Sequence, residues 1–277
     1  MKQELNFNPL ISIALTTYNG TKYLRKQLDS LLNQTYQNFE IVISDDGSNE
    51  ETISILNEYA NKDTRVRWSR SPCERGFVKN TQNAILLCNG EIIFLCDQDD
   101  IWYGDKVQLH IDAYRDPSIM WVYNKLVLIN KNDNEVGYLN DLVKDYYSKK
   151  RMKLLYYTWG SCIGGAATSY RASILHKVMP IGKYAPAHDS WIQLAIFPAK
   201  CFFIDKVLQA YRLHGENEVG WGKEKTLDEI REVEQRAIFD NMRYLKYLPK
   251  NTNIQIWKRI FFKVVYWAKI LRLKIRN

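Results

Sequence analysis

Short apolar runs alternate with amphipathic stretches from Pro9 to Ile129. Four of the apolar runs are typical of buried β-strands, and the stretches between them repeat apolar residues every three or four positions, as helices do. The pattern predicts strands at 10–17, 39–46, 65–70 and 91–97 and helices at 22–34, 50–60 and 77–88. Apolar strands separated by helices indicate a mostly parallel sheet covered on both faces, a Rossmann-like α/β layer with right-handed crossovers.

The pattern changes after this region. Residues 130–153 are polar and predict an excursion from the fold, whereas 159–171 are apolar and rich in glycine. Glycine there suggests a backbone that passes close to a ligand or to another segment. Strand character returns at 202–214, and a capping-box pattern predicts a further helix over about 227–247.

Polar clusters follow three of the predicted strands at the point where each strand ends. They are TTYNG at 16–20, SDDGS at 44–48 and DQDD at 97–100. The carboxyl ends of parallel strands meet at one edge of a sheet, and the ligands of open α/β sheets gather there. We therefore expect the three clusters to line one binding site.

The cluster DQDD places Asp97, Asp99 and Asp100 within four positions. Carboxylates this close repel one another, and their joint ionisation is disfavoured unless a positive group lies between them. A divalent cation is one such group. The alternatives are an acidic surface loop and a helix N-terminus, which favours negative charge. The shared sheet edge favours the cation, because an accidental acidic loop has no reason to lie beside two other polar loops.

A nucleotide is a candidate ligand for this edge, although the usual phosphate-binding loops are missing. The sequence contains neither G-x-G-x-x-G after its first strand nor G-x-x-x-x-G-K-[ST] anywhere. Asp46 could hydrogen-bond to a base edge, and Tyr18 could stack on the base. The alternatives are an aspartate that shapes the Asp-Gly turn and a tyrosine that belongs to the core.

Composition changes the picture mainly through the position of the charge. Of the 277 residues, 46% are hydrophobic and 25% charged, which excludes wholesale disorder. The net charge is +8, but residues 241–277 hold ten Lys or Arg and no acidic residue, so the other 240 residues carry −2.

The five cysteines are scattered and never spaced C-x-x-C, which favours a reducing compartment over a disulfide framework or a zinc site. No signal sequence or long apolar span is evident, so a cytoplasmic location is expected.

The basic tail predicts an amphipathic helix over 256–276. A broad apolar face with aromatic residues and only positive charge opposite it is typical of a helix that lies in the plane of an anionic membrane surface. A terminal helix docked on the rest of the fold is the alternative. The apolar face argues against nucleic-acid binding. That face is formed by Trp257, Ile260, Phe261, Val264, Trp267, Ala268, Leu271 and Ile275.

Five motifs, in this order and spacing, resemble those of glycosyltransferase family 2, whose members have the GT-A fold: TTYNG, SDDGS, DQDDIW, HDSW and YRLHGEN. The resemblance covers residues 9–220, approximately. Within the family, the motifs are most similar to those of the rhamnosyltransferase-like branch, which extends bacterial cell-surface polysaccharides. One loop departs from the family, because many members have Asn before its Gly, whereas Glu74 and Arg75 precede Gly76 here. Arg75 and Lys79 either face the diphosphate or belong to a solvated charged surface.

The resemblance implies roles for individual residues by position. Asp189 matches the catalytic base, and the alternative is the N-cap of a helix that begins near Ser190. His214 matches a histidine that in some members reaches the metal or the diphosphate. Trp191 is expected to pack a wall of the acceptor cleft. The residues implied in donor binding are Thr16, Tyr18, Asp46, Asp97 and Lys79, those in metal binding are Asp97, Asp99 and His214, and the further candidates are Asp45, Asp100, Arg75, His188 and Trp191.

The family implies inverting transfer of a sugar from a UDP- or dTDP-sugar to a lipid-linked glycan acceptor, with Mn²⁺ or Mg²⁺ and without an enzyme nucleophile. Residues 1–222 would form the GT-A domain, with a donor half at 9–129 and an acceptor half at 130–222. Residues 223–277 would hold the enzyme at the inner face of the cell membrane. Two alternatives stay open: a non-catalytic nucleotide-sugar-binding partner, and a nucleotidyltransferase, which would normally show a Gly-rich basic loop after its first strand.

Overall fold

The structure is a computed structural model of the whole chain and describes residues 7–138, 164–182, 185, 187–196 and 199–214. The helices predicted at 227–247 and 256–276 lie outside the described residues. Most of the polar segment at 130–153 lies outside them as well.

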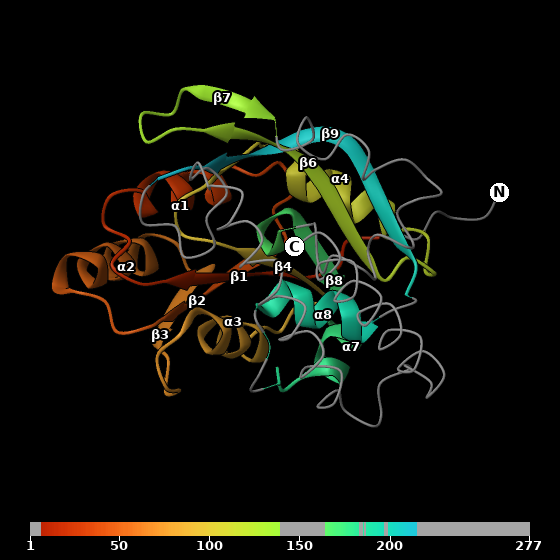
Figure 1. Cartoon of the computed structure of the whole chain (residues 1–277), viewed down its shortest axis with the longest axis horizontal. Helices are drawn as coiled ribbons and strands as arrows, with labels where there is room; N and C mark the ends of the chain where they lie inside the picture. Colours follow the sequence, from red (N-terminus) through yellow and green to blue (C-terminus); the bar gives the residue numbers. More distant parts are fainter. Residues whose placement is uncertain (1–6, 139–163, 183–184, 186, 197–198, 215–277) are drawn as a thin grey trace, which may run out of the picture.

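One mixed sheet organises the described part of the chain (Figure 1). The strand order is β3-β2-β1-β4-β8-β6-β9-β5, with β7 paired to β6. β1 to β4 run parallel, β8 is antiparallel to β4 and β6, and β9 is parallel to β6. The loops after β1, β2 and β4 therefore leave the sheet at one edge. The strands are β1 Ile11–Thr17, β2 Phe39–Asp45, β3 Val66–Arg70, β4 Ile92–Cys96, β5 Ile101–Trp102, β6 Trp121–Ile129, β7 Glu135–Tyr138, β8 Thr168–Arg171 and β9 Cys201–Arg212.

Helices cover both faces of the sheet. α1, α2 and α4 pack on one face, and α3, α7 and α8 pack on the other. In Figure 1 α1 lies above β1, while α3 and α8 lie below it. The α-helices are α1 Leu24–Leu32, α2 Glu50–Lys62, α3 Phe77–Leu86, α4 Lys106–Ala113, α7 Ala172–Leu175 and α8 His188–Ile196. Two short 3₁₀ turns, η1 Gly165–Ala167 and η2 His176–Val178, flank β8 and α7.

The alternation of side chains along the central strands supplies both cores. Ile13 and Leu15 of β1 point to the face covered by α1, α2 and α4, and Ala14 points to the face covered by α3 and α8. All three are fully buried. Burying an Ile or Leu side chain is worth about 1.5–3 kcal/mol, so two-sided burial makes these strands the most stable part of the sheet.

The predicted α/β class and the mostly parallel sheet are confirmed. The predicted strand at 202–214 is β9, Cys201–Arg212. Strands β6 and β8, which join β9 to the parallel half, were not predicted. No helix among the described residues is both long enough and apolar enough to span a bilayer.

Candidate active site

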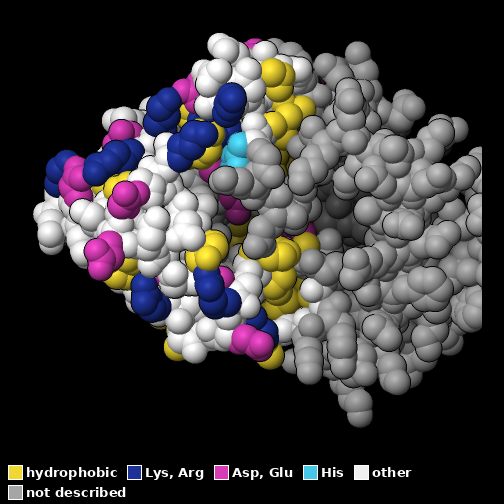
Figure 2. Space-filling view, turned by 60° about the vertical axis from the view of Figure 1, so that its left-hand side comes forward, with side chains coloured by type: hydrophobic (Ala, Val, Ile, Leu, Met, Phe, Trp, Pro, Cys, Tyr) yellow, Lys and Arg dark blue, Asp and Glu magenta, His cyan; other side chains and the backbone are white. Residues whose placement is uncertain are grey.

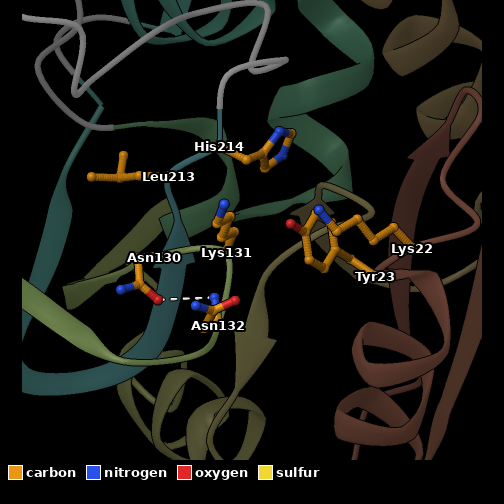
Figure 3. A pocket seen from close by; sticks show the side chains of 7 residues that line it. All are labelled: Lys22, Tyr23, Asn130, Lys131, Asn132, Leu213 and His214. Atoms are coloured by element: carbon orange, nitrogen blue, oxygen red, sulfur yellow. Dashed lines mark hydrogen bonds between the residues drawn. The ribbon is translucent and has the colours of Figure 1, made fainter.

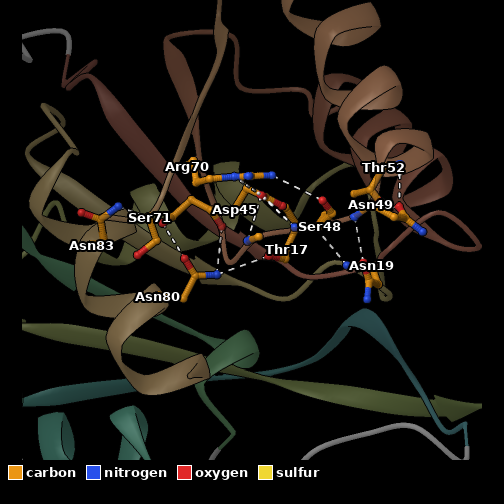
Figure 4. Close-up of polar contacts among 12 residues, drawn as sticks. Thr17, Asn19, Asp45, Ser48, Asn49, Thr52, Arg70, Ser71, Asn80 and Asn83 are labelled. Carbon is orange, nitrogen blue, oxygen red and sulfur yellow. Dashed lines mark hydrogen bonds and ion pairs between the residues drawn. The ribbon is translucent and has the colours of Figure 1, made fainter. Parts of the chain in front are cut away.

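The loop that follows β1 is fastened to the loop that follows β2 (Figure 4). The backbone N–H of Asp46 donates to the carbonyl of Thr17 at 2.9 Å, and the N–H of Asn19 donates to Ser48 Oγ at 2.9 Å. The N–H of Asn49 returns a hydrogen bond to Asn19 Oδ1 at 2.9 Å. Asn19 has a φ of 49°, a left-handed conformation that asparagine tolerates better than most residues. The two polar clusters therefore form one surface.

The two aspartates of SDDGS have different surroundings. Asp45 is fully buried, and its Oδ2 accepts the N–H groups of Gly47 and Ser48, both at 3.0 Å, so its side chain shapes the turn. Asp46 is half-buried, and its Oδ2 accepts the N–H of Gly76 at 2.8 Å, at the start of α3. Asp46 thus lies where the loops after β2 and β3 meet.

Tyr18 presents an aromatic ring at this edge. Its side chain is 43% exposed, and the Arg75 guanidinium lies 4.4 Å from the ring centroid, within cation–π distance. Arg75 therefore lies on the tyrosine that is predicted to stack on a base. Thr16 at the end of β1 and Lys79 in the first turn of α3 are half-buried.

The acidic loop after β4 brings Asp99 against His214, which follows β9. His214 Nε2 lies 2.7 Å from Asp99 Oδ2, although 115 positions separate the two residues in the sequence. Burial, together with the nearby carboxylates of Asp99 and Asp189, raises the pKa of Asp97 to about 7. The structure therefore brings three carboxylates and one imidazole from distant parts of the sequence into one electrostatic cluster.

Asp100, the third acid of the loop, turns away from this cluster. It is buried, and its carboxylate accepts hydrogen bonds from Gln209 Nε2 at 2.5 Å and from the Arg212 N–H at 3.0 Å. Gln209 in turn accepts a hydrogen bond from Lys106 Nζ at 2.5 Å. Burial lowers the pKa of Lys106 to about 7, and burial with the neighbouring aspartates raises that of Asp100 well above its usual value. Asp100 fastens the acidic loop to β9.

Asp189 lies in the first turn of α8 and faces the Gly-rich segment. Its Oδ1 accepts the N–H of Ser190 at 2.6 Å, and its Oδ2 accepts the N–H of Gly165 at 3.3 Å. The helix begins at His188, so Asp189 is inside the helix and the suggested N-cap is wrong by two residues. A Cβ at Gly165 would lie 2.4 Å from His188 Nε2, so this backbone does pass close to another segment.

Trp191 belongs to the core. It is 1% exposed, packs in the cluster that joins α3, α8 and the sheet, and donates from Nε1 to the carbonyl of Val178 at 2.8 Å. Its position gives Trp191 a packing role in the core between α3, α8 and the sheet.

A pocket of about 430 Å³ opens beside His214. In Figure 3 the hydroxyl of Tyr23, the ammonium of Lys131 and the ring of His214 point toward a shared space. The Tyr23 hydroxyl is buried and has no hydrogen-bond partner among the described residues. The lining consists of Lys22, Tyr23, Asn130, Lys131, Asn132, Leu213 and His214.

The pocket has unneutralised positive charge. Within the described residues neither Lys22 nor Lys131 forms an ion pair, whereas Lys26 nearby is paired with Asp133. Figure 2 shows Lys and Arg side chains next to a histidine on this face of the molecule. Such a pocket favours an anionic ligand, and a buried hydroxyl that lacks a partner offers it a donor.

The structure reveals two polar residues of the site that sequence reasoning missed. Gln98 hydrogen-bonds to Thr17 and Tyr18 across the edge of the sheet. Asn80 of α3 is buried, and its amide bonds to Ser44 Oγ at 2.5 Å and to the Ser44 carbonyl at 2.9 Å (Figure 4). The sequence did contain a signal for both residues in their positions. Gln98 stands between two aspartates, and Asn80 is a polar residue on the apolar side of its helix.

The side chains of this cluster provide some, but not all, of the ligands that a divalent cation needs. A carboxylate and an imidazole 2.7 Å apart, with a second carboxylate whose pKa is raised by its acidic neighbours, form a site that a cation would stabilise. Three His, Cys, Asp or Glu side chains do not converge into a complete metal site in the described part of the chain. Further ligands would have to come from a substrate or from water.

Residues 12–179 match the family model for glycosyl transferase family 2. The chain belongs to glycosyltransferase family 2. This glycosyltransferase is 34% identical to Escherichia coli chondroitin synthase over 145 residues, which cover 52% of this chain but 21% of that protein. It is 26% identical over 262 residues to an uncharacterized glycosyltransferase of Rickettsia typhi, RT0329, covering 92% and 77% of the two chains. It is also 28% identical over 123 residues to the E. coli glucosyltransferase WfgD, covering 44% and 48%.

Solved structures with the same fold include two glycosyltransferases. S. aureus TarS in complex with UDP matches at a TM-score of 0.61 with 17% identity, over 93% of this chain and 70% of that one. The mannosyltransferase PcManGT from Pyrobaculum calidifontis matches at 0.61 with 16% identity, over 96% and 65%. The predicted GT-A fold is confirmed.

Proposed function

We propose that this glycosyltransferase binds its donor across the sheet edge and transfers the sugar with inversion, using a divalent cation and Asp189 as the general base. The observation that carries the proposal is the cluster of Asp97, Asp99, Asp189 and His214 at the edge that also presents Tyr18. The strand order β2-β1-β4-β8 places Asp46 and Tyr18 first, the acidic loop next and the turn that contacts Asp189 last. This is the order of nucleobase, diphosphate and sugar in a donor.

The nucleoside end fits the surface formed by the loops after β1 and β2. The exposed ring of Tyr18 offers a stacking face, and the half-buried carboxylate of Asp46 lies beside it in the same interlocked loops. TarS is described in complex with UDP, and PcManGT with GDP-Man and Mn²⁺. The nucleobase, expected to be uracil or thymine, remains part of the proposal.

Asp97, Asp99 and His214 are the residues that would hold Mn²⁺ or Mg²⁺. When bound, such a cation neutralises the negative charge that develops on a departing diphosphate. Lys22 and Lys131 add positive charge next to His214, so the same region of the protein attracts the diphosphate electrostatically. The carboxylates alone would repel it.

Asp189 has the position of a general base. In the proposed reaction its carboxylate takes the proton of the acceptor hydroxyl while the acceptor oxygen bonds to the anomeric carbon and the bond from that carbon to the diphosphate breaks. The N–H groups of Gly165 and Ser190 orient the carboxylate, and the N-terminus of α8 favours its negative charge. A single displacement needs no nucleophile from the enzyme.

The acceptor and the location of the enzyme are proposals drawn from the sequence. The name of WfgD gives it a diphosphoundecaprenol-linked acceptor, which supports a lipid-linked glycan for this chain. The basic tail would keep the enzyme at the inner face of the membrane, beside such an acceptor. Rhamnose as the sugar rests only on the resemblance of the motifs.

The test compares Asp189→Asn with the wild-type enzyme. We expect the variant to bind UDP or dTDP, measured by calorimetry with Mn²⁺, with unchanged affinity, and to lose at least about 100-fold in sugar transfer or donor hydrolysis. Asp112→Asn, an exposed aspartate of α4, is the matched control. Full turnover in Asp189→Asn would remove that residue from the mechanism. Donor binding without turnover in the wild type would favour the non-catalytic partner.

A further inference from the structure

The side chain of Gln98 joins the two loops from which the donor site is built. Thr17 Oγ1 donates to Gln98 Oε1 at 2.6 Å, and the N–H of Tyr18 donates to the same oxygen at 2.9 Å. Gln98 Nε2 donates to the carbonyl of Tyr18 at 3.0 Å. One amide therefore pairs with both backbone groups of Tyr18, as a neighbouring β-strand would.

The amide of Gln98 fits against the loop because position 20 is a glycine, which has no side chain. A Cβ at Gly20 would lie 2.3 Å from Gln98 Oε1 and 3.1 Å from Thr17 Oγ1. The distance to Gln98 is too short for any real contact, so an alanine at Gly20 would displace the amide. Gly20 and Gln98 are thus matched, although 78 positions separate them in the sequence.

Gln98 stands between Asp97 and Asp99, so its contacts link the acidic loop directly to Tyr18. The neighbouring residues Thr17 and Asn19 are hydrogen-bonded to the loop after β2, but in the described part of the chain both backbone groups of Tyr18 itself bond to Gln98. We propose that Gln98 is a positioning residue that holds Tyr18 at a fixed separation from the carboxylates of Asp97 and Asp99. The inference rests on the proposed function, in which Tyr18 takes the nucleobase and the carboxylates act at the diphosphate.

The chemistry of the link requires an uncharged amide. A glutamate at this position would lack the N–H that donates to the Tyr18 carbonyl and would add a further negative charge to an acidic loop. A methionine would keep the length and volume of the side chain but make none of the three hydrogen bonds. Gln98→Met therefore isolates the hydrogen bonds from packing.

The first measurement does not involve a ligand. In the unliganded protein the Tyr18 amide is hydrogen-bonded to Gln98, so we expect Gln98→Met to raise its hydrogen-exchange rate by at least about tenfold, as followed by NMR. Gly20→Ala should produce the same change although it leaves the glutamine in place. The control is Gln108→Met, because Gln108 is on α4 and bonds to Asp112 of the same helix. An unchanged Tyr18 exchange rate in both test variants would overturn the inference.

The second measurement connects the link to the donor. We expect the Kd for UMP without metal to rise about tenfold in Gln98→Met and in Gly20→Ala, while the melting temperature stays close to that of the control. Equal Kd values in the variants and the wild type, with a changed exchange rate, would show a loop contact without a positioning role and would also overturn the inference. Failure of the wild type to bind any nucleotide would contradict the proposed function, and the exchange measurement would still decide the link.

Discussion

At the scale of single residues, the three neighbouring aspartates of the acidic loop have separate tasks. Asp99 contacts His214, and Asp97 interacts electrostatically with Asp99 and Asp189. Asp100 is committed to hydrogen bonds with β9. The chain bends at Gln98 and Asp99 after β4 ends, and this geometry divides one acidic motif into a part that faces His214 and a part that bonds to β9.

The two lysines of the pocket offer a residue-scale test of where the diphosphate binds. We expect Lys22→Met combined with Lys131→Met to raise the Kd for UDP about tenfold and to leave the Kd for uridine unchanged, because only UDP carries the phosphate charge. Calorimetry at two salt concentrations measures the effect, which should shrink at high salt. Lys177→Met combined with Lys62→Met removes two positive charges at exposed sites on η2 and α2 and serves as the control. An equal effect on uridine would contradict an electrostatic role.

The sequence allowed part of the site to be predicted at this scale. The resemblance of the motifs to the family assigned Asp99 and His214 to one metal site, and the structure brings the two side chains into contact. Their role in metal binding stays a prediction. The sequence did not reveal the hydrogen bonds between Gln98 and Tyr18, because they depend on the register between β1 and β4, which no local pattern encodes. The pocket between α1 and the β6–β7 turn depends on tertiary packing in the same way.

At the scale of elements, η1 and α8 form the mounting of the proposed base. The N–H of Gly165 donates to Asp189, and the Cα of Gly165 packs against His188. Lys106 Nζ donates to the carbonyl of Ala166 at 2.8 Å, so α4 also holds this turn in place. The distance between the turn and α8 therefore controls where the base lies.

Gly165→Ala tests this mounting. The added Cβ would lie 2.4 Å from His188 Nε2 and would push α8 away from the turn. We expect kcat to fall by about 10- to 100-fold with an unchanged Kd for UDP, because displacement of a catalytic group by about 1 Å costs on the order of 100-fold. Steady-state kinetics and calorimetry separate the two effects. Gly164→Ala adds the same methyl group at a position where no other described residue lies within 4 Å of it, and it should be neutral. Equal kcat values for the two variants would contradict the role of the turn.

Helix α4 carries a pH-sensitive support of the sheet. His110 is buried and hydrogen-bonds to Ser169 at 2.8 Å and to Asn124 at 3.0 Å. Burial lowers the pKa of His110 to about 3, and the Lys106 charge contributes to the shift. A depressed histidine pKa means that the unfolded chain binds the proton first. The stabilisation is therefore complete above about pH 6.5 and is lost as the pH falls toward 3.

We expect this histidine to add about 1.4 kcal/mol per pH unit to the loss of unfolding free energy below pH 6.5. Urea unfolding at pH 7.5, 6.0 and 5.0 measures the slope. His110→Gln, which keeps a neutral polar side chain, should lack the contribution of His110 to this slope, whatever the stability of the variant at pH 7.5. His176→Gln changes an exposed histidine and should keep it. Identical slopes in wild type and His110→Gln would contradict the assignment.

At the scale of the whole molecule, a parallel half carries Tyr18, Asp46 and the acidic loop, and a mixed half with α8 adds Asp189 and His214. The α/β order of the first half was predictable because apolar strands and amphipathic helices alternate there with short loops. Strand β6 was missed although its sequence, WVYNKLVLI, is mostly apolar. A buried run of this kind gives no periodicity that distinguishes strand from helix, and its partners β8 and β9 lie far along the chain.

The basic tail makes a whole-molecule prediction from the sequence. Residues 241–277 concentrate ten positive charges, whereas the rest of the chain is slightly acidic. We expect the full chain to sediment with vesicles that contain anionic lipid, with binding that weakens as salt increases, and a chain ending at residue 249 to remain in solution. Neutral vesicles are the control. Equal sedimentation of the two chains would show that the tail is not the anchor.

The proposed arrangement of donor and protein is tested most directly by a crystal structure of the enzyme with Mn²⁺ and either UDP or dTDP. We expect the nucleobase of the donor to stack on Tyr18 beside Asp46. We expect the diphosphate and its metal to lie between Asp97, Asp99 and His214. A nucleotide bound elsewhere, or a diphosphate at this edge with no metal near Asp99, would contradict the account.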